Sequence, residues 1–172
     1  MSTGQSRRAL NEWAVLGLLA EAPAHPFAIA RQLGPDGRLG RVITVRRPLV
    51  YRAVERLRRD GLVERHRTEP SGSGPERTVY RVTAAGRRGL DAWLREPVAH
   101  IRDLRLAFLL KLALLRMSGE PVGPLVAAQR AALAGTLSAL ERLSGDPDDT
   151  DLWRQHSAAA VASFLDDLSR RG

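Results

Sequence analysis

Residues 46–83 read RRPLVYRAVERLRRDGLVERHRTEPSGSGPERTVYRVT, and this segment carries the strongest structural signals in the chain. Pro48 has a fixed φ and no N–H to lose, so it predicts the first turn of a helix. Apolar residues follow at helical spacing and predict one buried stripe: Leu49, Val50, Ala53, Val54 and Leu57. Gly61 supplies a left-handed cap at the end. The segment therefore begins with a short amphipathic helix whose outer face is basic.

A two-stranded hairpin is predicted to follow this helix. Leu62-Val63 opens a strand that reaches about Thr68, and residues 69–75 (EPSGSGP) have the composition of a turn. Residues 77–82 (RTVYRV) alternate in polarity as a half-buried return strand does. A basic helix followed by a basic hairpin fits a DNA major groove and its flanking phosphates. The alternative is an ordinary solvated face on a small α+β domain.

The positive charge is concentrated in the same half of the chain. Residues 1–96 carry 18 arginines against 10 acidic residues, whereas residues 97–172 carry 9 basic and 9 acidic residues. Such focusing indicates an anionic partner. Double-stranded DNA is favoured over a membrane, because the chain has no long basic amphipathic helix.

Composition excludes several classes of protein. With no cysteine, the chain has no disulfide framework, thiolate metal site or cysteine nucleophile. The four histidines are scattered without metal-ligand spacing, and no nucleophile and base are paired, so we predict neither a metal nor a cofactor nor an enzyme. No signal peptide is evident, and the most apolar segment, residues 104–115, is too short to span a bilayer. A soluble cytoplasmic protein is expected.

The rest of the chain is predicted to be helical. Helices over about 10–20, from residue 26 to 33, and from Thr83 to about 94 complete a winged helix-turn-helix domain at residues 9–96. Three more helices (about 101–117, 121–143 and 149–169) form a second domain at residues 97–172. The fold class is therefore mostly α with a small β-wing. Because helix 101–117 is apolar on nearly all sides, we expect the second domain to pair two subunits. Capping of the first domain within one chain is the alternative.

This order of elements resembles the PadR family of bacterial transcriptional regulators. The matching motifs are LGLL (16–19), AHPFAI (24–29), VYRAVERL (50–57), DGLV (60–63), VYRVTAAG (79–86), RDLR (102–105) and FLLKL (108–112). Single motifs also occur in other winged helices such as MarR-like proteins, but their order and spacing are fairly specific. The likeness is good over about 10–117 and loose beyond. The chain departs from the family at His25-Pro26-Phe27, where relatives usually have His-Gly-Tyr, and at Arg46-Arg47-Pro48, where many have small polar residues.

The resemblance implies a set of DNA-contacting residues. Tyr51 and Arg52 would face the DNA, with arginine suited to guanine and tyrosine more often to phosphate. Arg46, Arg47, Arg56 and Arg59 would contact the backbone, and Pro48 lies on the same outward face. Arg77 in the wing either enters the minor groove or forms a salt bridge with Glu69 or Glu76.

The resemblance also implies a mode of action. The protein would be a homodimeric repressor on a palindromic operator, relieved when an effector changes the separation of the two recognition helices. We expect each tryptophan, Trp13, Trp93 and Trp153, to pack in the core. Some relatives bind flat aromatic effectors between subunits, and Trp13, Trp93 and Phe108 are the candidates for that role here. A basic protein that associates with RNA or the chromosome without an operator is the competing function.

Overall fold

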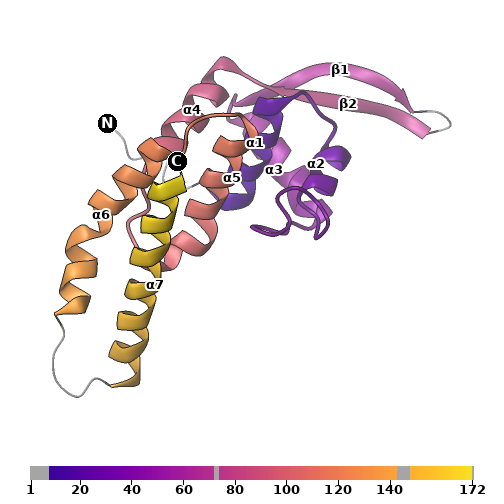
Figure 1. The fold of residues 1–172 in the computed structure, drawn as a ribbon. Coiled ribbons are helices and arrows are strands. Elements are labelled where there is room, and N and C mark those ends of the chain that lie inside the picture. The colour runs from indigo at the N-terminus through magenta and orange to yellow at the C-terminus, as the bar shows by residue number, and fades with distance from the viewer. Residues whose placement is uncertain (1–7, 72–73, 143–147, 172) are drawn as a thin grey trace.

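The computed structural model describes residues 8–71, 74–142 and 148–171 (Figure 1). In chain order the elements are α1 (Leu10–Glu21), α2 (Pro26–Gln32), α3 (Arg47–Arg59), β1 (Val63–Ser71), β2 (Gly74–Val82), α4 (Ala84–Arg95), η1 (Ile101–Asp103), η2 (Leu104–Phe108), α5 (Leu109–Met117), α6 (Gly123–Glu141) and α7 (Asp149–Arg171). The fold is mostly helical, with a two-stranded antiparallel wing followed by C-terminal helices, as the sequence predicts. No helix in the described residues is long and apolar enough to cross a membrane.

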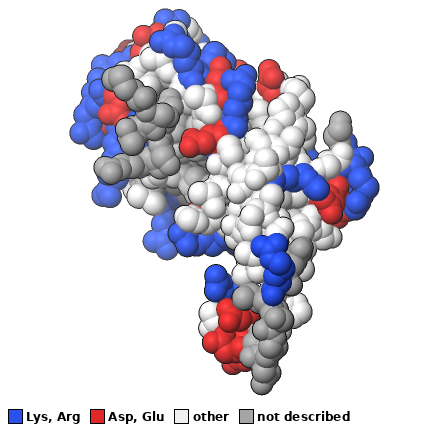
Figure 2. Space-filling view, turned by 90° about the vertical axis from the view of Figure 1, so that its left-hand side faces the viewer, with Lys and Arg blue, Asp and Glu red and all other residues white. Residues whose placement is uncertain are grey.

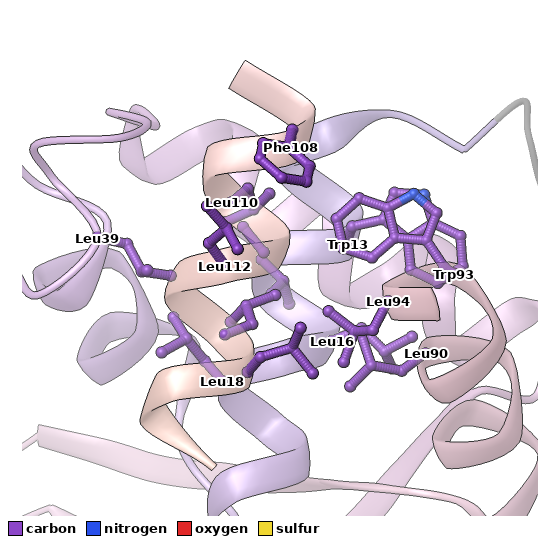
Figure 3. Packing of buried hydrophobic residues seen from close by; sticks show 14 of the residues in the cluster. Trp13, Leu16, Leu18, Leu39, Leu90, Trp93, Leu94, Phe108, Leu110 and Leu112 are labelled. Atoms are coloured by element: carbon purple, nitrogen blue, oxygen red, sulfur yellow. The ribbon is translucent and has the colours of Figure 1, made fainter. Parts of the chain in front are cut away.

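Helix α1 lies at the centre of the molecule and packs against α3, α4, α5 and β2. Every residue from Glu12 to Leu19 is buried, because neighbours cover this helix on most of its circumference. The buried side chains of α1, α4 and α5 form one cluster (Figure 3). Within it, the rings of Trp13 and Trp93 are stacked with centroids 4.8 Å apart. The hydrophobic core is therefore continuous from the N-terminal to the C-terminal helices, and a domain boundary between residues 96 and 97 stays a proposal.

Helix α3 matches its predicted pattern with one exception. Val50, Ala53, Val54 and Leu57 are buried, and Gly61 has the left-handed φ of +70° expected of a cap. Leu49, which we assigned to the same buried stripe, is 42% exposed. At 3.6 residues per turn it lies roughly a quarter turn from the centre of the stripe, beyond the reach of α1.

The wing is longer than its composition predicts. Glu69, Pro70 and Ser71 belong to β1, and Gly74 and Pro75 belong to β2, although we expected all of them in the turn. Pro70 is accommodated because the register shifts between Glu69 and Ser71, and a proline without N–H is tolerated at such a bulge. The hairpin extends well beyond the helices (Figure 1).

Helix α4 is fixed to the end of α3 at its first turn. The Thr83 hydroxyl accepts a hydrogen bond from the Gly86 N–H at 3.0 Å, as predicted for an N-cap, and donates one to the Gly61 carbonyl at 2.8 Å. Gly86 is required by space, because a Cβ atom there would lie 2.1 Å from the carbonyl oxygen of Leu62.

The predicted helix 101–117 is a 3₁₀ turn (η1), a π-helical turn (η2) and a short α-helix (α5). We expected that one chain could not bury all of its apolar residues. Phe108, Leu110, Leu112 and Leu114 are at most 4% exposed and belong to the core cluster. Leu106, at 37% exposed, and Leu109, which is half-buried, are not fully covered within the chain.

Two buried polar side chains bind the backbone between α4 and η1. The Gln129 amide of α6 accepts a hydrogen bond from the Val98 N–H at 2.8 Å and donates one to the Val98 carbonyl at 2.9 Å. The Lys111 ammonium of α5 donates to the Glu96 carbonyl and lies 4.6 Å from the centre of the Trp93 ring. The connection between the two halves is therefore held by side chains rather than left free.

Candidate nucleic-acid interface

The outward side of α3 displays the residues that the sequence singled out. Tyr51 is 42% exposed, and Arg46, Arg47, Pro48, Arg52 and Arg59 are exposed as well. They point outward because the buried stripe of the helix faces α1 and α2. The N-terminus of α3 also leaves backbone N–H groups without helical partners, and such groups favour anions.

Five of the predicted contacts are exposed arginines, and we call them the arginine face: Arg46, Arg47, Arg52, Arg59 and Arg77. None of the five forms an ion pair or a side-chain hydrogen bond with another described residue. A guanidinium without an internal acidic partner keeps all its donors for an external anion. The arginine face is therefore the strongest candidate site for phosphate.

Two arginines on the flanks of α3 have internal partners. Arg56 bonds the buried carboxylate of Glu12 at 3.0 Å, and Arg58 bonds Glu55 at 2.7 Å. The Arg58 guanidinium lowers the pKa of the Glu55 carboxyl. Arg56 thus lies on the α1 side of the helix, and its predicted contact with the DNA backbone stays a prediction. Sequence reasoning missed Glu12, although an acidic residue among the apolar residues of α1 was the available signal.

In the wing, the arginine face continues on β2. Arg77 lies opposite Glu69 in the strand register, but Glu69 accepts a hydrogen bond from Arg67 at 2.8 Å. Within the described residues Arg77 has neither of the salt bridges that we weighed for it. Figure 2 shows Lys and Arg side chains gathered over the upper part of the molecule and a group of acidic residues at its lower tip.

Aromatic residues from α2 adjoin this surface. The Arg47 guanidinium lies over the ring of Phe27, 4.5 Å from its centre, and the rings of His25 and Tyr51 meet edge to face at 6.2 Å. Burial, followed by the charge of Arg77, lowers the pKa of His25. We had not assigned His25 to the site, since sequence alone gave it no metal or catalytic pattern.

The structure places the three effector candidates inside the core. Trp13 and Trp93 are 2% and 6% exposed and stack on each other, and Phe108 is fully buried and meets Phe164 edge to face at 6.5 Å. Binding of an aromatic effector by these residues stays a prediction. The third tryptophan, Trp153, is not core as expected but 73% exposed.

Trp153 lies at an apolar groove that the sequence did not reveal. We call it the α6–α7 groove; it measures about 800 Å³, and its apolar walls include Ile101, Leu104, Leu140, Val161 and Phe164. Arg102, Arg105 and Arg154 also line it. Its residues come from η1, η2, α6 and α7, which are too far apart in sequence for a local pattern to connect them.

Comparison with known proteins finds a family that part of the chain resembles. Residues 15–92 match the model of the transcriptional regulator PadR-like family. The solved structures include Bacillus subtilis PadR in complex with operator DNA, which is 20% identical with a TM-score of 0.49 and covers 92% of this chain and 97% of that one. Another is smu.1604c from Streptococcus mutans UA159, which is 16% identical with a TM-score of 0.45. That match covers 93% of this chain and 96% of the other chain. No curated protein matches. The matched residues, 15–92, span most of α1 and α4 and all of α2, α3 and the wing, and over this part the chain is similar to the transcriptional regulator PadR-like family.

Proposed function

We propose that the protein is a DNA-binding transcriptional regulator that represses as a homodimer on a palindromic operator. The observation that carries DNA binding is the arginine face, whose five guanidinium groups form no ion pair or side-chain hydrogen bond with a described acidic residue. With α3 in the major groove, Arg52 and Tyr51 reach base edges or phosphates, and Arg46 and Arg47 bind the backbone beside the start of the helix. Arg77 extends the contact along the wing.

Two arginine substitutions test this assignment. We expect Arg52→Ala to weaken operator binding by ~1–3 kcal/mol with a smaller effect on random DNA, as for a base contact. Arg47→Ala should weaken the binding of operator and random DNA alike. It should also reduce the slope of log affinity against log salt concentration by about 0.9 for each phosphate that the protein no longer neutralises. Gel-shift titrations at several salt concentrations measure both effects.

Arg58→Ala is the matched control, because Arg58 lies on the same helix but its guanidinium is bound to Glu55 at 2.7 Å. We expect it to change operator affinity least of the three. Unchanged operator affinity in a folded Arg52→Ala protein would remove Arg52 from the site. Equal competition by RNA and by random DNA would instead favour the competing function, a basic protein that binds RNA or the chromosome without an operator.

The homodimer is supported by the α6–α7 groove and the residues around it. Trp153 lines the groove and is 73% exposed near the start of α7. A large aromatic side chain in water forgoes a substantial hydrophobic gain, and exposed apolar residues beside a groove mark a surface for a partner. A second copy covering this groove would bury these residues and fix the spacing of the two recognition helices.

A charge introduced at this surface is expected to separate the subunits. Trp153→Asp removes the exposed aromatic ring and introduces a charge that burial against a second copy would leave unpaired, so the dimer dissociation constant should rise at least tenfold. Sedimentation equilibrium of the full chain measures it. The control is Ala159→Asp, which adds the same charge to an exposed position of α7 that does not line the groove. Wild-type protein that is monomeric at micromolar concentration would contradict the homodimer.

A further inference from the structure

His25 lies where α2, α3 and the wing meet. The residue before it, Ala24, is paired with Tyr80 of β2, with the Ala24 N–H donating at 2.9 Å and the Tyr80 N–H donating at 3.0 Å. The residue after it, Pro26, begins α2. Its own ring meets the ring of Tyr51 on α3 edge to face at 6.2 Å. His25 therefore contacts or adjoins α2, α3 and β2.

The imidazole of His25 acts as the N-cap of α2. Its Nδ1 accepts a hydrogen bond from the backbone N–H of Phe27 at 3.1 Å. An accepting Nδ1 requires a lone pair, so the ring is neutral and carries its proton on Nε2. Protonation of Nδ1 would turn the acceptor into a donor facing another donor. The cap exists only while the imidazole is neutral.

The surroundings of His25 oppose its protonation. Arg77 of β2 disfavours the charged ring, and Glu69 of β1 favours it; Arg67, which binds Glu69, lines the same small pocket. Phe27, with the Arg47 guanidinium over its ring, lies two residues further along α2. From α3, the exposed phenol of Tyr51 faces the ring. Burial and Arg77 together lower the pKa of His25 below 6.5.

We propose that His25 is a positioning residue: its neutral imidazole caps α2 and supports Tyr51 beside the wing, so specific DNA binding requires His25 to be unprotonated. This inference rests on the proposed DNA binding. Acid removes the cap, loosens the start of α2 and releases the ring of Tyr51. The phosphate contacts of the arginine face are unaffected, because guanidinium groups keep their charge. Acidification should then lower the affinity for the operator more than the affinity for random DNA.

The first test needs no DNA. A histidine with a lowered folded pKa binds protons more readily when unfolded, so the protein loses stability as the pH falls below 6.5. We expect the free energy of unfolding of wild type to fall between pH 7.5 and pH 5.5 by more than that of His25→Asn, since asparagine caps a helix but does not titrate. NMR of the imidazole nitrogens should show the proton on Nε2 at pH 7.5. A proton on Nδ1, or the same pH dependence in both proteins, would overturn the cap.

The second test is operator affinity at constant salt. Between pH 7.5 and pH 5.5 we expect the operator affinity of wild type to fall about fivefold more than that of His25→Asn. This is the change in affinity that corresponds to the free energy of one N-cap. His25→Ala should bind the operator more weakly than wild type at both pH values, whereas His25→Asn should keep most of the wild-type affinity at pH 7.5. His66→Asn, which removes an exposed histidine of β1, is the matched control and should keep the wild-type pH dependence.

The outcomes separate the two proposals. Wild-type affinity that rises on acidification would overturn the inference, since it would mean that a protonated His25 binds phosphate directly. Failure of operator binding at every pH would contradict the proposed function, while the unfolding and NMR measurements still decide whether the cap exists. A pH-dependent stability difference together with a pH-independent operator affinity would limit His25 to the fold and overturn its part in DNA binding.

Discussion

Replacing Trp13 with alanine is expected to lower the free energy of unfolding by ~3–5 kcal/mol, the range for deletion of a large buried aromatic side chain. Trp13 is 2% exposed, and its ring is stacked at 4.8 Å on Trp93 of α4. Deletion leaves a cavity between α1 and α4 and exposes the Trp93 ring to it. Denaturant unfolding monitored by circular dichroism measures the loss.

Phe27→Ala is the control for this prediction. It also truncates an aromatic residue, but Phe27 is 38% exposed on α2, so we expect a loss of at most about 1 kcal/mol. Similar stability losses in the two variants would show that the tryptophan pair is not packed as described. A small loss for Trp13→Ala, together with weaker binding of an aromatic compound, would instead favour the predicted effector role of Trp13 and Trp93.

Adding one methyl group at Gly86 should destabilise the protein by about 3 kcal/mol, at the upper end for overpacking. The new Cβ would lie 2.1 Å from the Leu62 carbonyl oxygen and 2.9 Å from a methyl carbon of Val82. A flexible side chain moves aside cheaply, but the Leu62 carbonyl is backbone, and Leu62 lies between the Gly61 cap and β1. Relief therefore requires α4 to shift relative to the wing.

Gly135→Ala provides the matched substitution. Gly135 is also helical, in α6, but a Cβ there meets nothing within 4 Å. Alanine should therefore stabilise the protein by ~0.5–1 kcal/mol through its higher helix propensity. Thermal or denaturant unfolding of both variants measures the two changes in the free energy of unfolding, which should have opposite signs. Destabilisation of similar size in both would mean that Gly86 is not held against Leu62.

The sequence predicts those parts of the fold that local chemistry determines. Proline at the start of α3, the left-handed Gly61 and the Thr83 cap each act over a few residues, and the structure has all three. The length of the wing was underestimated, because Pro70 and the glycines have the composition of a turn while the strand register accommodates proline at a bulge. Composition alone does not specify such a bulge.

Burial of single residues was less predictable, because it depends on contacts between distant segments. Leu112 and Leu114 are apolar residues of the kind assigned to a subunit interface, yet both are buried in the core of one chain. Trp153 is a large aromatic residue of the kind expected in a core, yet it is exposed. The partner of Arg56 was equally beyond the sequence, since Glu12 is 44 residues away. The sequence also did not show that Glu69, which lies opposite Arg77, is bound by Arg67.

Lys111 gives the protein an unusual chemical property. It is the only lysine in the sequence, and its side chain is 2% exposed beneath Trp93 and the Glu96 carbonyl. Amine-reactive cross-linkers would therefore find no accessible lysine with which to join two subunits, so a negative result from such reagents says nothing about assembly. Burial lowers the pKa of Lys111 to about 8, and the unprotonated amine that these reagents require is thus well populated in mildly alkaline buffer. What limits the reaction is access, which requires α4 and α5 to part. The rate of modification at Lys111, followed by mass spectrometry of the peptide that contains it, therefore measures how often that contact opens, with and without DNA.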